Sequence, residues 1–334
     1  MPTLPDSFRA FVVDRAADGD FSRGLRDVDI SQLPQGEVTV RVAWSSVNYK
    51  DALAARPDGR VARAYPLIPG IDLAGTVVAS DDDAFPVGAP VLANGYEIGV
   101  SRHGGYGELA RLPSGWAVPQ PAGLSARQAM AIGTAGFTAA MSVVALEERG
   151  LRPGDGPVLV TGASGGVGSA AIAILAARGH EVWAATGKVD ERDRLRGLGA
   201  SGFLTREEVT APGRPLERER WAGAVDTVGA ATLPYVLRTL RIGAGVASSG
   251  NASGAELSTT VFPFILRGCA LLGMDSGNMA IGPRRALWGR LAADLLPRGL
   301  DDSISEVLLD DLEPALDAIH AGQARGRWVV RVAG

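Results

Sequence analysis

A glycine-rich segment in the middle of the chain has the residue types of a phosphate-binding turn. The apolar run Pro157–Thr161 leads into Gly162-Ala-Ser-Gly-Gly-Val-Gly168, and an apolar segment typical of a helix follows. Residues 163–168 form a G-x-G-x-x-G pattern with Ala in the first place. Glycines at this spacing let the backbone approach a pyrophosphate, and the helix N-terminus offers unpaired N–H groups. The segment therefore predicts a dinucleotide site, with contacts from Ser164, Gly165, Gly166 and Val167.

The end of the next expected strand bears on which dinucleotide would bind. NAD enzymes usually carry an acidic residue about 20 residues after the glycine turn, where it accepts from the ribose hydroxyls. This chain has Thr186-Gly187-Lys188 there, and Arg206 follows the next short strand. The two cations suit a 2′-phosphate and favour NADPH. Asp190 and Glu191 lie just beyond; they could reverse this choice, or they could form the first turn of the next helix.

The pattern of apolar runs predicts an α/β chain with two domains. In residues 1–127, short strands separated by Gly and Pro indicate a small barrel or sandwich. They are expected at residues 37–44, 73–79, 89–93 and 106–112. In residues 128–299 one long helix is followed by alternating strands and helices, which predicts an open parallel sheet. Residues 300–334 form a further α+β stretch that is expected to complete the first domain.

Composition and charge narrow the classes of function. The chain has 33 basic and 37 acidic residues, a formal net charge of −4, which argues against general nucleic-acid binding. One cysteine allows no disulfide framework. Residues 128–146 carry no charge, but their small and hydroxyl residues suit a buried helix better than a membrane span. No secretory signal is recognisable, so a cytoplasmic protein with no membrane partner is expected.

Several stretches resemble one branch of a known superfamily. They are Trp44-Ser-Ser-Val-Asn-Tyr-Lys-Asp-Ala-Leu53, Pro69-Gly-Ile-Asp-Leu-Ala-Gly75, Ile132-Gly-Thr-Ala-Gly-Phe-Thr138, Trp221-Ala-Gly-Ala-Val-Asp-Thr-Val-Gly229 and Thr259-Thr-Val-Phe-Pro-Phe-Ile-Leu-Arg267. With the domain order, they are similar to the medium-chain dehydrogenase/reductase superfamily. The match is to its zinc-independent acryloyl-CoA reductase branch, whose members are often described as NADPH quinone oxidoreductases. The resemblance implies a GroES-like β-rich catalytic domain and a Rossmann doubly wound parallel-sheet domain that binds NADPH.

The resemblance also carries expectations for single positions. Zinc-dependent members have Cys, His and Cys where this chain has Asn48, Ile71 and Thr134, so no metal site is expected. Cofactor contacts are implied for Tyr49, Thr134, Asn251, Ile265 and Ser276. The branch commonly has a longer aliphatic residue at the position of Asn251. A strand within residues 261–274 pairs across a dimer axis in the superfamily, so a homodimer is expected.

Without zinc, an activated C=C bond is a better substrate than a simple ketone, which would lose its Lewis acid. Hydride addition to the β-carbon places negative charge on the conjugated carbonyl oxygen, which needs hydrogen-bond donors. Asn48 and Tyr49 are the best candidates for these donors. The proton for the α-carbon could come from Tyr49, from Asp72 or from water. Lys50 and Asp51 are interpreted as a structural charge pair.

Three functions fit these residues. The favoured one is NADPH-dependent reduction of a small α,β-unsaturated acyl-CoA; the alternatives are an NADPH quinone oxidoreductase and a non-catalytic NADPH-binding redox sensor. A CoA thioester carries phosphates, which Arg56, Arg60 and Arg63 or the pair Arg284-Arg285 could meet. A solvated charged loop is slightly preferred for these arginines. A quinone would need only a flat apolar slot.

Overall fold

The computed structural model describes residues 4–332, which divide into two compact units. Unit 1 contains the residues up to Thr134, residues Gly277–Ala292 and the residues from Leu300 onward. Unit 2 contains Ala135–Ser276 and Ala293–Gly299. The expected domains instead divide at residues 127/128 and keep residues 128–299 together. In the structure, the chain returns to unit 1 for residues 277–292 before its C-terminal segment.

Unit 1 is built mainly from antiparallel strands. The ribbon β1–β2 stands beside a seven-stranded sheet of order β14-β15-β3-β4-β5-β7, in which β6 pairs with β3. The strands are β1 Ser7–Arg15, β2 Phe21–Asp29, β3 Val38–Ser46, β4 Asp72–Ser80, β5 Pro90–Asn94, β6 Leu109–Leu112, β7 Val118–Pro119, β14 Ile304–Leu308 and β15 Arg327–Arg331; the helices are α1 Tyr49–Ala54, α8 Ile281–Leu291 and α9 Leu312–His320. Because β15 pairs with the end of β3, the last strand of the chain lies beside Ser46.

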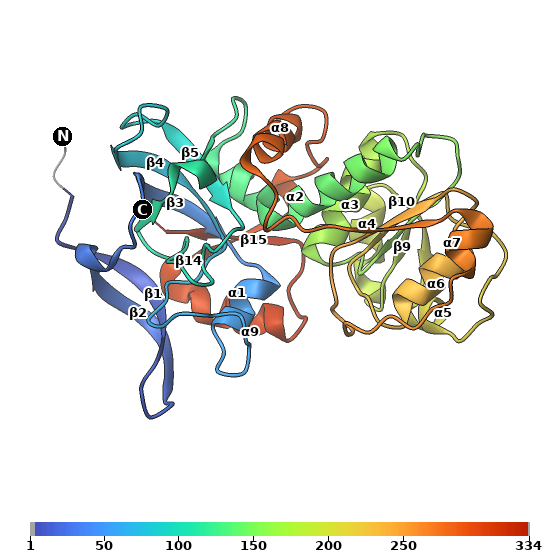
Figure 1. Cartoon of the computed structure of the whole chain (residues 1–334), viewed down its shortest axis with the longest axis horizontal. Coiled ribbons are helices and arrows are strands. Elements are labelled where there is room, and N and C mark those ends of the chain that lie inside the picture. The colour runs from blue at the N-terminus through green and yellow to red at the C-terminus, as the bar shows by residue number, and fades with distance from the viewer. Residues whose placement is uncertain (1–3, 333–334) are drawn as a thin grey trace. The chain divides into compact units, whose positions relative to one another are not determined.

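Unit 2 is a six-stranded parallel sheet of order β10-β9-β8-β11-β12-β13, and Figure 1 shows helices flanking it. The strands are β8 Val158–Thr161, β9 Val182–Ala185, β10 Ala200–Leu204, β11 Gly223–Asp226, β12 Gly245–Ser248 and β13 Ala270–Gly273; the helices are α3 Gly166–Ala177, α4 Arg192–Gly197, α5 Arg206–Thr210, α6 Thr232–Thr239 and α7 Phe262–Arg267. The strand order reverses between β8 and β11, the point at which such sheets bind ligands. The expected α/β fold, a β-rich domain with a doubly wound parallel sheet, is confirmed.

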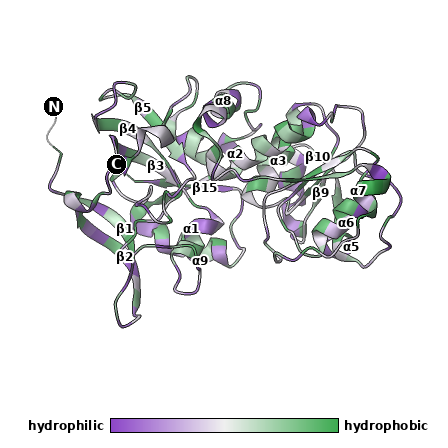
Figure 2. Cartoon of the chain, in the orientation of Figure 1, coloured by the Kyte–Doolittle hydropathy of each residue, from purple (hydrophilic) through white to green (hydrophobic). Residues whose placement is uncertain are grey.

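The long helix α2, Ala126–Glu148, is apolar enough to cross a membrane by length and composition. In the structure, 78% of its apolar window is buried inside the protein, as in the core helix of a soluble domain. Figure 2 shows α2 coloured mainly from white to green along its length. The expectation of one continuous helix is wrong, because Gly133 has a left-handed φ of 49° and divides α2 into two segments.

The break at Gly133 removes backbone hydrogen bonds that an unbroken helix would make, and side chains of unit 1 replace them. The amide of Thr134 would donate to the carbonyl of Met130 in a regular helix. It donates instead to Asp72 Oδ2 at 3.0 Å. Arg327 donates to the carbonyl of Met130 through Nη2 at 3.4 Å and to that of Ala131 through Nε at 2.8 Å. One buried carboxylate and one buried guanidinium therefore satisfy both sides of the break.

Gly133 cannot be replaced without disturbing these side chains. A Cβ atom there would lie 2.6 Å from Arg327 Nη2 and 2.7 Å from Asp72 Oδ2. Gly133→Ala should therefore lower the free energy of unfolding by about 3 kcal/mol or more, which combines backbone strain at a positive φ with the displacement of two buried charged side chains. Gly123→Ala is the matched control, since its φ is +89° and a Cβ atom there would have no neighbour within 4 Å. It should cost only about 1–2 kcal/mol. Equal losses in chemical denaturation would contradict this explanation.

Candidate active site

Asn48 and Tyr49 lie where β3 gives way to the first turn of α1. Asn48 is the N-cap of this helix, and its backbone N–H donates to Asp51 Oδ2 at 2.9 Å, as in a capping box. Tyr49 is the first helical residue. The sequence Asn-Tyr-Lys-Asp thus folds locally into a capped helical start, so the orientation of Tyr49 depends on how Asn48 and Asp51 are held.

Asp72 joins three side chains and one backbone amide in the interior of unit 1. Its carboxylate is completely buried at the start of β4. It accepts from Ser46 Oγ at 2.5 Å, from Asn48 Nδ2 at 2.9 Å, and from Thr134 through Oγ1 at 2.5 Å and the amide at 3.0 Å. The structure therefore brings together three residues singled out from the sequence, Asn48, Asp72 and Thr134, as one hydrogen-bonded cluster. We call Ser46, Asn48, Asp51, Asp72, Thr134 and Arg327 the buried polar cluster.

The side chain of Asn48 is directed into this cluster. Its Nδ2 atom lies 2.9 Å from Asp72 Oδ2, 3.1 Å from Asp51 Oδ2 and 3.0 Å from Ser46 Oγ, while its Oδ1 accepts from Arg327 Nη1 at 3.3 Å. An amide has two N–H groups, and three acceptors compete for them here. The expected role of Asn48 as a donor to a substrate oxygen is not supported by this geometry. Asn48 instead fixes the start of α1.

Asp51 and Arg327 belong to the cluster although neither was assigned a role in chemistry from the sequence. Asp51 Oδ1 accepts from the amide of Ile71 at 2.8 Å, which ties α1 to the segment before β4. The expected Lys50–Asp51 charge pair is wrong. Asp51 is fully buried and accepts from the backbone amides of Asn48 and Ile71, whereas the Lys50 side chain is exposed. Arg327 had no local signal, since it is one of 33 basic residues and reaches the cluster only through the pairing of β15 with β3.

Burial raises the pKa of Asp51 to about 7, and the nearby charge of Asp72 adds to this effect. The same burial lowers the pKa of Arg327, which the two carboxylates partly offset. The cluster thus contains two buried carboxyl groups and one buried guanidinium. Near neutral pH, one of the carboxyl groups is therefore partly protonated.

Tyr49 is the exposed member of this region. Its side chain is 51% exposed, and its ring stacks on the imidazole of His320 with centroids 6.0 Å apart and planes 11° apart. His320 is the last residue of α9, which packs against α1 (Figure 1). No sequence pattern joins two residues so far apart in the chain. Tyr49 is thus a half-exposed phenol on a backbone anchored by the buried polar cluster.

In unit 2 the glycine-rich turn has the predicted form. Gly162 follows β8 with a left-handed φ of +57°, and Gly165 is the N-cap of α3. A Cβ at Gly168 would lie 2.4 Å from the carbonyl oxygen of Gly162, so glycine is required for this close approach of helix and strand. At Gly165 the nearest atom is the same carbonyl oxygen at 3.3 Å. Both glycines therefore allow the turn to pack closely against the start of α3.

The residues expected near a 2′-phosphate meet around Gly187. A Cβ at Gly187 would lie 3.4 Å from Arg206 Nε, so the guanidinium packs over this glycine next to Lys188. Thr186 Oγ1 donates to Ser164 Oγ at 3.4 Å and accepts from the amide of Lys188 at 3.1 Å. These contacts connect the end of β9 to the glycine-rich turn.

Glu191, the acid that could have indicated NAD, is buried. It pairs with Arg194 Nε at 2.6 Å, and Arg194 Nη2 donates to the carbonyl of Ser164 at 3.2 Å. The role of Arg194 was not predicted from the sequence, although a spacing of three residues on a helical segment, here from Glu191, commonly indicates an ion pair. Asp190 is exposed in the short 3-10 helix that precedes α4.

The remaining predicted cofactor residues follow other strands of unit 2. Asn251 lies in the turn after β12, and its Cα is 3.4 Å from the Cβ position of Gly229, beyond β11. Ser276 follows β13 and its Oγ accepts from Thr138 Oγ1 at 2.7 Å. Ile265 lies on α7 with a side chain that is 68% exposed. Asn251 and Ser276 therefore follow the carboxyl ends of their strands, whereas Ile265 is on a helix surface.

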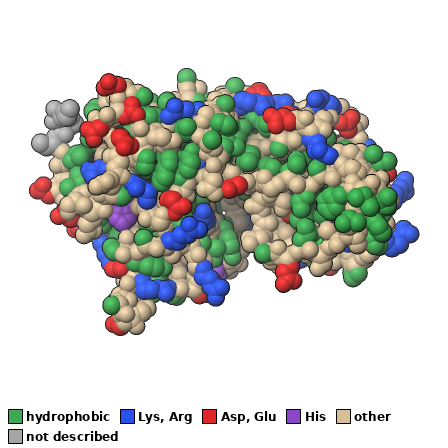
Figure 3. Space-filling view, in the orientation of Figure 1, with side chains coloured by type: hydrophobic (Ala, Val, Ile, Leu, Met, Phe, Trp, Pro, Cys, Tyr) green, Lys and Arg blue, Asp and Glu red, His purple; other side chains and the backbone are tan. Residues whose placement is uncertain are grey.

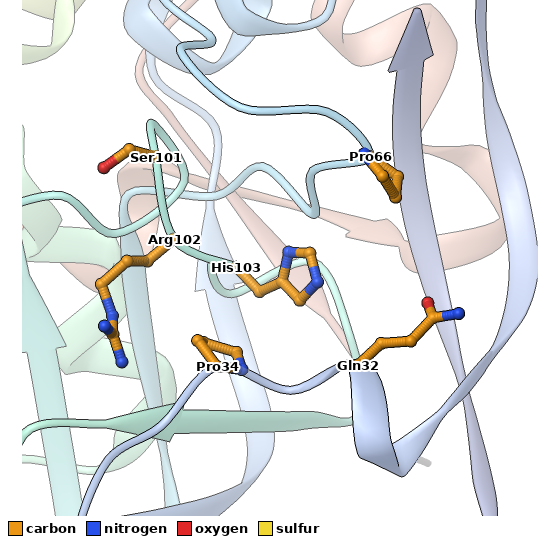
Figure 4. Close-up of a pocket in the computed structure, with 6 residues that line it drawn as sticks. All are labelled: Gln32, Pro34, Pro66, Ser101, Arg102 and His103. Atoms are coloured by element: carbon orange, nitrogen blue, oxygen red, sulfur yellow. The ribbon is translucent and has the colours of Figure 1, made fainter. Parts of the chain in front are cut away.

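A surface pocket of unit 1 contains none of the predicted site residues. Its volume is about 450 Å³, and Figure 4 shows its lining by Gln32, Pro34, Pro66, Ser101, Arg102 and His103. His103 Nδ1 accepts from the amide of Ile68 at 3.2 Å, and Arg102 donates to the carbonyl of Gln35. These polar groups thus support the loops of unit 1. Within residues 4–332, no group of three or more His, Cys, Asp or Glu side chains is placed to hold a metal ion.

Comparisons with known proteins identify the family of this chain. Residues 34–122 match the alcohol dehydrogenase GroES-like domain, and residues 166–292 match the zinc-binding dehydrogenase family. Acrylyl-CoA reductase AcuI of Ruegeria pomeroyi is 49% identical over 97% of this chain and 99% of its own length. The chain belongs to the medium-chain dehydrogenase/reductase superfamily.

Members of this superfamily with solved structures have the same fold. The yhdH oxidoreductase of Salmonella enterica, crystallised with NADP, superposes with a TM-score of 0.94 at 46% identity, over 97% of this chain and 100% of that one. YhfP of Bacillus subtilis, named as a candidate quinone oxidoreductase, is 45% identical over 97% of this chain and 99% of its own. Its crystal structure with NAD has a TM-score of 0.95 and covers 98% of this chain and 100% of that one.

The buried polar cluster includes positions at which the resemblance to the superfamily predicts the loss of zinc ligands. Asn48 and Thr134, which the resemblance predicts to match two ligand positions of the zinc-dependent members, both donate to Asp72. The third matching position, Ile71, contributes its backbone amide to Asp51. In this chain, hydrogen bonds therefore involve all three of these predicted positions.

The raised pKa of Asp51 makes stability depend on pH. The pKa is about 7 in the folded chain and close to the ordinary value of 3.8 when unfolded, so the folded state retains the proton between these values. The free energy of unfolding should therefore fall as pH rises from about 4 to about 7, then level off. Asp51→Asn should remove a decline of a few kcal/mol, because each pKa unit corresponds to about 1.4 kcal/mol.

Chemical denaturation at pH 5 and pH 8 measures this difference. Asp193→Asn is the control, because the Asp193 side chain is 94% exposed. If wild type and Asp51→Asn show the same change in unfolding free energy between the two pH values, the assignment of the proton to Asp51 is wrong.

Proposed function

We propose that this chain is an NADPH-dependent reductase of the conjugated C=C bond of a small α,β-unsaturated acyl-CoA, acting without zinc. The observation that carries the proposal is the exposed phenol of Tyr49, anchored on a buried polar cluster at the positions predicted to match zinc ligands. The nearly full-length similarity to an acrylyl-CoA reductase supports the choice of substrate class. A polar donor in place of a Lewis acid suits an activated C=C bond better than a simple ketone.

The residues of unit 2 fit an NADPH molecule. The N-terminus of α3, which begins with Gly165 as its N-cap, suits a pyrophosphate, while Lys188 and Arg206 beside Gly187 suit a 2′-phosphate. Arg194 Nη1 is buried and has no hydrogen-bond partner among the described residues, next to the Ser164 carbonyl that Nη2 contacts. A similar relative was crystallised with NADP, which agrees with this choice. Thr134, Asn251, Ile265 and Ser276 stay proposed contacts.

Bound NADPH supplies the hydride that adds to the β-carbon of the substrate. Tyr49 donates a hydrogen bond to the thioester oxygen, on which negative charge develops, and this stabilises the transition state. Asn48 orients α1 and with it Tyr49. The α-carbon receives a proton, for which the exposed Tyr49 or water is better placed than Asp72, because Asp72 is completely buried and accepts hydrogen bonds from three side chains.

A quinone oxidoreductase is the second candidate, because a relative named as a candidate for that activity is 45% identical to this chain. The arginines distinguish the two substrates. Arg284 and Arg285 donate to backbone carbonyls of Asn94 and Ala117, so they are used within unit 1. Arg60 and Arg63 have exposed side chains on the loop after α1, and they are the proposed contacts for CoA phosphates.

We further propose that the protein is a cytoplasmic homodimer. Strand β13 is an edge strand of the parallel sheet, and α7 precedes it. Val261, Phe262, Ile265 and Leu266 are exposed there, and Figure 3 shows a hydrophobic patch over this part of unit 2. An apolar surface beside an open sheet edge supports association with a second copy.

The choice of cofactor can be measured with two substitutions. Lys188→Ala and Arg206→Ala together should raise the KM for NADPH about 10- to 100-fold, because each removes a charge-assisted hydrogen bond to phosphate. The KM for NADH should change little, since NADH lacks that phosphate. Arg196→Ala is the control, because Arg196 pairs with Asp193 at 2.5 Å on the exposed face of α4. An equal response of both cofactors would contradict the assignment.

The proposed function is tested by NADPH oxidation with acryloyl-CoA, crotonyl-CoA and a benzoquinone measured side by side. Turnover should be fastest with acryloyl-CoA, and Tyr49→Phe should lower it about 100-fold, the usual contribution of a positioned donor. Turnover with the quinone alone would favour the second candidate. NADPH binding with no turnover on any substrate would favour a redox sensor.

Acryloyl-pantetheine, which lacks the nucleotide phosphates, adds a substrate-based control to the same assay. Arg60→Ala with Arg63→Ala should raise the KM for acryloyl-CoA and leave that for acryloyl-pantetheine unchanged. Arg41→Ala, an exposed arginine on β3, is the matched control variant. A similar rise for both thioesters would show that these arginines do not contact the phosphates.

A further inference from the structure

Helix α9 places His320 on the side that faces α1. Leu312, Leu316 and His320 recur at every fourth residue, so their side chains share one face of the helix. Leu312 and Leu316 are buried in the core of unit 1. His320 continues this face beyond the core and reaches the ring of Tyr49, whose plane lies 11° from that of the imidazole. The stack is therefore an extension of the α1–α9 packing and not an isolated surface contact.

The other end of the same helix pair is held by Arg23 of β2. Arg23 donates to Asp317 of α9 at 2.8 Å and to the carbonyl of Ala55, the C-cap of α1, at 3.3 Å. It also approaches Glu313 at 3.4 Å. The position of α9 along α1 is therefore set at one end by Arg23 and at the other by the stack of His320 on Tyr49.

The segment that follows α9 supports the start of α1 from the interior of unit 1. Strand β15 begins at Arg327, whose guanidinium donates to Asn48 Oδ1 at 3.3 Å from inside the buried polar cluster. One C-terminal segment thus contacts two consecutive residues, Asn48 from the interior and Tyr49 from the surface. The imidazole lies beside the Tyr49 ring in an offset parallel arrangement, and we expect this contact to restrict rotation of the phenol while the ring stays half exposed.

We propose that His320 is a positioning residue for Tyr49 in the reductase reaction. The inference rests on the proposed function, because it assigns His320 a role through the Tyr49 hydroxyl. An exposed tyrosine loses entropy when its hydroxyl must be held at one place, and a stacked ring provides that restraint before substrate binds. This role requires a planar ring at position 320. It does not require the imidazole nitrogens.

The test compares His320→Ala with His320→Phe. His320→Ala should lower kcat for acryloyl-CoA about tenfold, the effect of losing an aromatic pair that aligns a reacting group, and leave the KM for NADPH nearly unchanged. His320→Phe should restore kcat to within about threefold of wild type, because it keeps the stack. In a Tyr49→Phe background, His320→Ala should cause no further loss, since the hydroxyl it positions is absent.

Asp310→Ala is the matched control, because it removes an exposed ion pair with Arg9 at 2.9 Å and contacts neither α1 nor Tyr49. Its kcat should equal that of wild type, and thermal unfolding of every variant separates lost positioning from lost folding. Additive effects of Tyr49→Phe and His320→Ala, or a His320→Phe variant as slow as His320→Ala, would overturn the positioning role. A wild-type protein that reduces none of the substrates would instead contradict the proposed function.

Discussion

The carboxylate of Asp72 is the group on which the arrangement of unit 1 depends. It accepts the amide of Thr134 that the break at Gly133 releases, and also the side chains of Ser46 and Asn48. Arg327 satisfies the carbonyls on the other side of the break. A buried polar group left without a partner costs about 1–3 kcal/mol, so the broken helix is tolerable only because these two side chains meet it. The same bonds fix the end of β3, and hence the start of α1.

This arrangement buries two carboxyl groups, those of Asp51 and Asp72, and one guanidinium, that of Arg327, in the interior of unit 1. Burial raises the pKa of Asp51, and the charge of the neighbouring Asp72 adds to this effect. Buried ionic groups contribute little net stability, but they define one arrangement among many. Here that arrangement determines the direction of Asn48, whose amide is used internally, and leaves Tyr49 as the exposed donor. The contrast between two adjacent residues, one fully engaged and one available, suits a reaction that needs a fixed hydrogen-bond donor.

In unit 2, the backbone positions the candidate phosphate contacts. Its candidate phosphate contacts lie at the carboxyl ends of β8 and β9, beside the point where the strand order reverses. Two acidic residues follow β9, but Glu191 is neutralised by Arg194, and the same arginine reaches the carbonyl of Ser164. The ion pair thus removes a carboxylate charge from the end of β9 and places a guanidinium donor next to the glycine-rich turn. Both effects favour a cofactor with an additional phosphate.

The sequence by itself determined the features that depend on neighbouring residues. The glycine-rich turn, the alternating strands and helices of unit 2 and the short strands of unit 1 follow from local steric limits and from hydrophobic periodicity. The positions of Asn48 and Tyr49 after a strand were also predictable. Their different surroundings were not, because these depend on Asp72, Arg327 and His320, which approach only when β4, β15 and α9 pack together. The break at Gly133 was hidden for the same reason: an apolar run predicts a helix, and only the side chains that replace its lost hydrogen bonds permit the interruption.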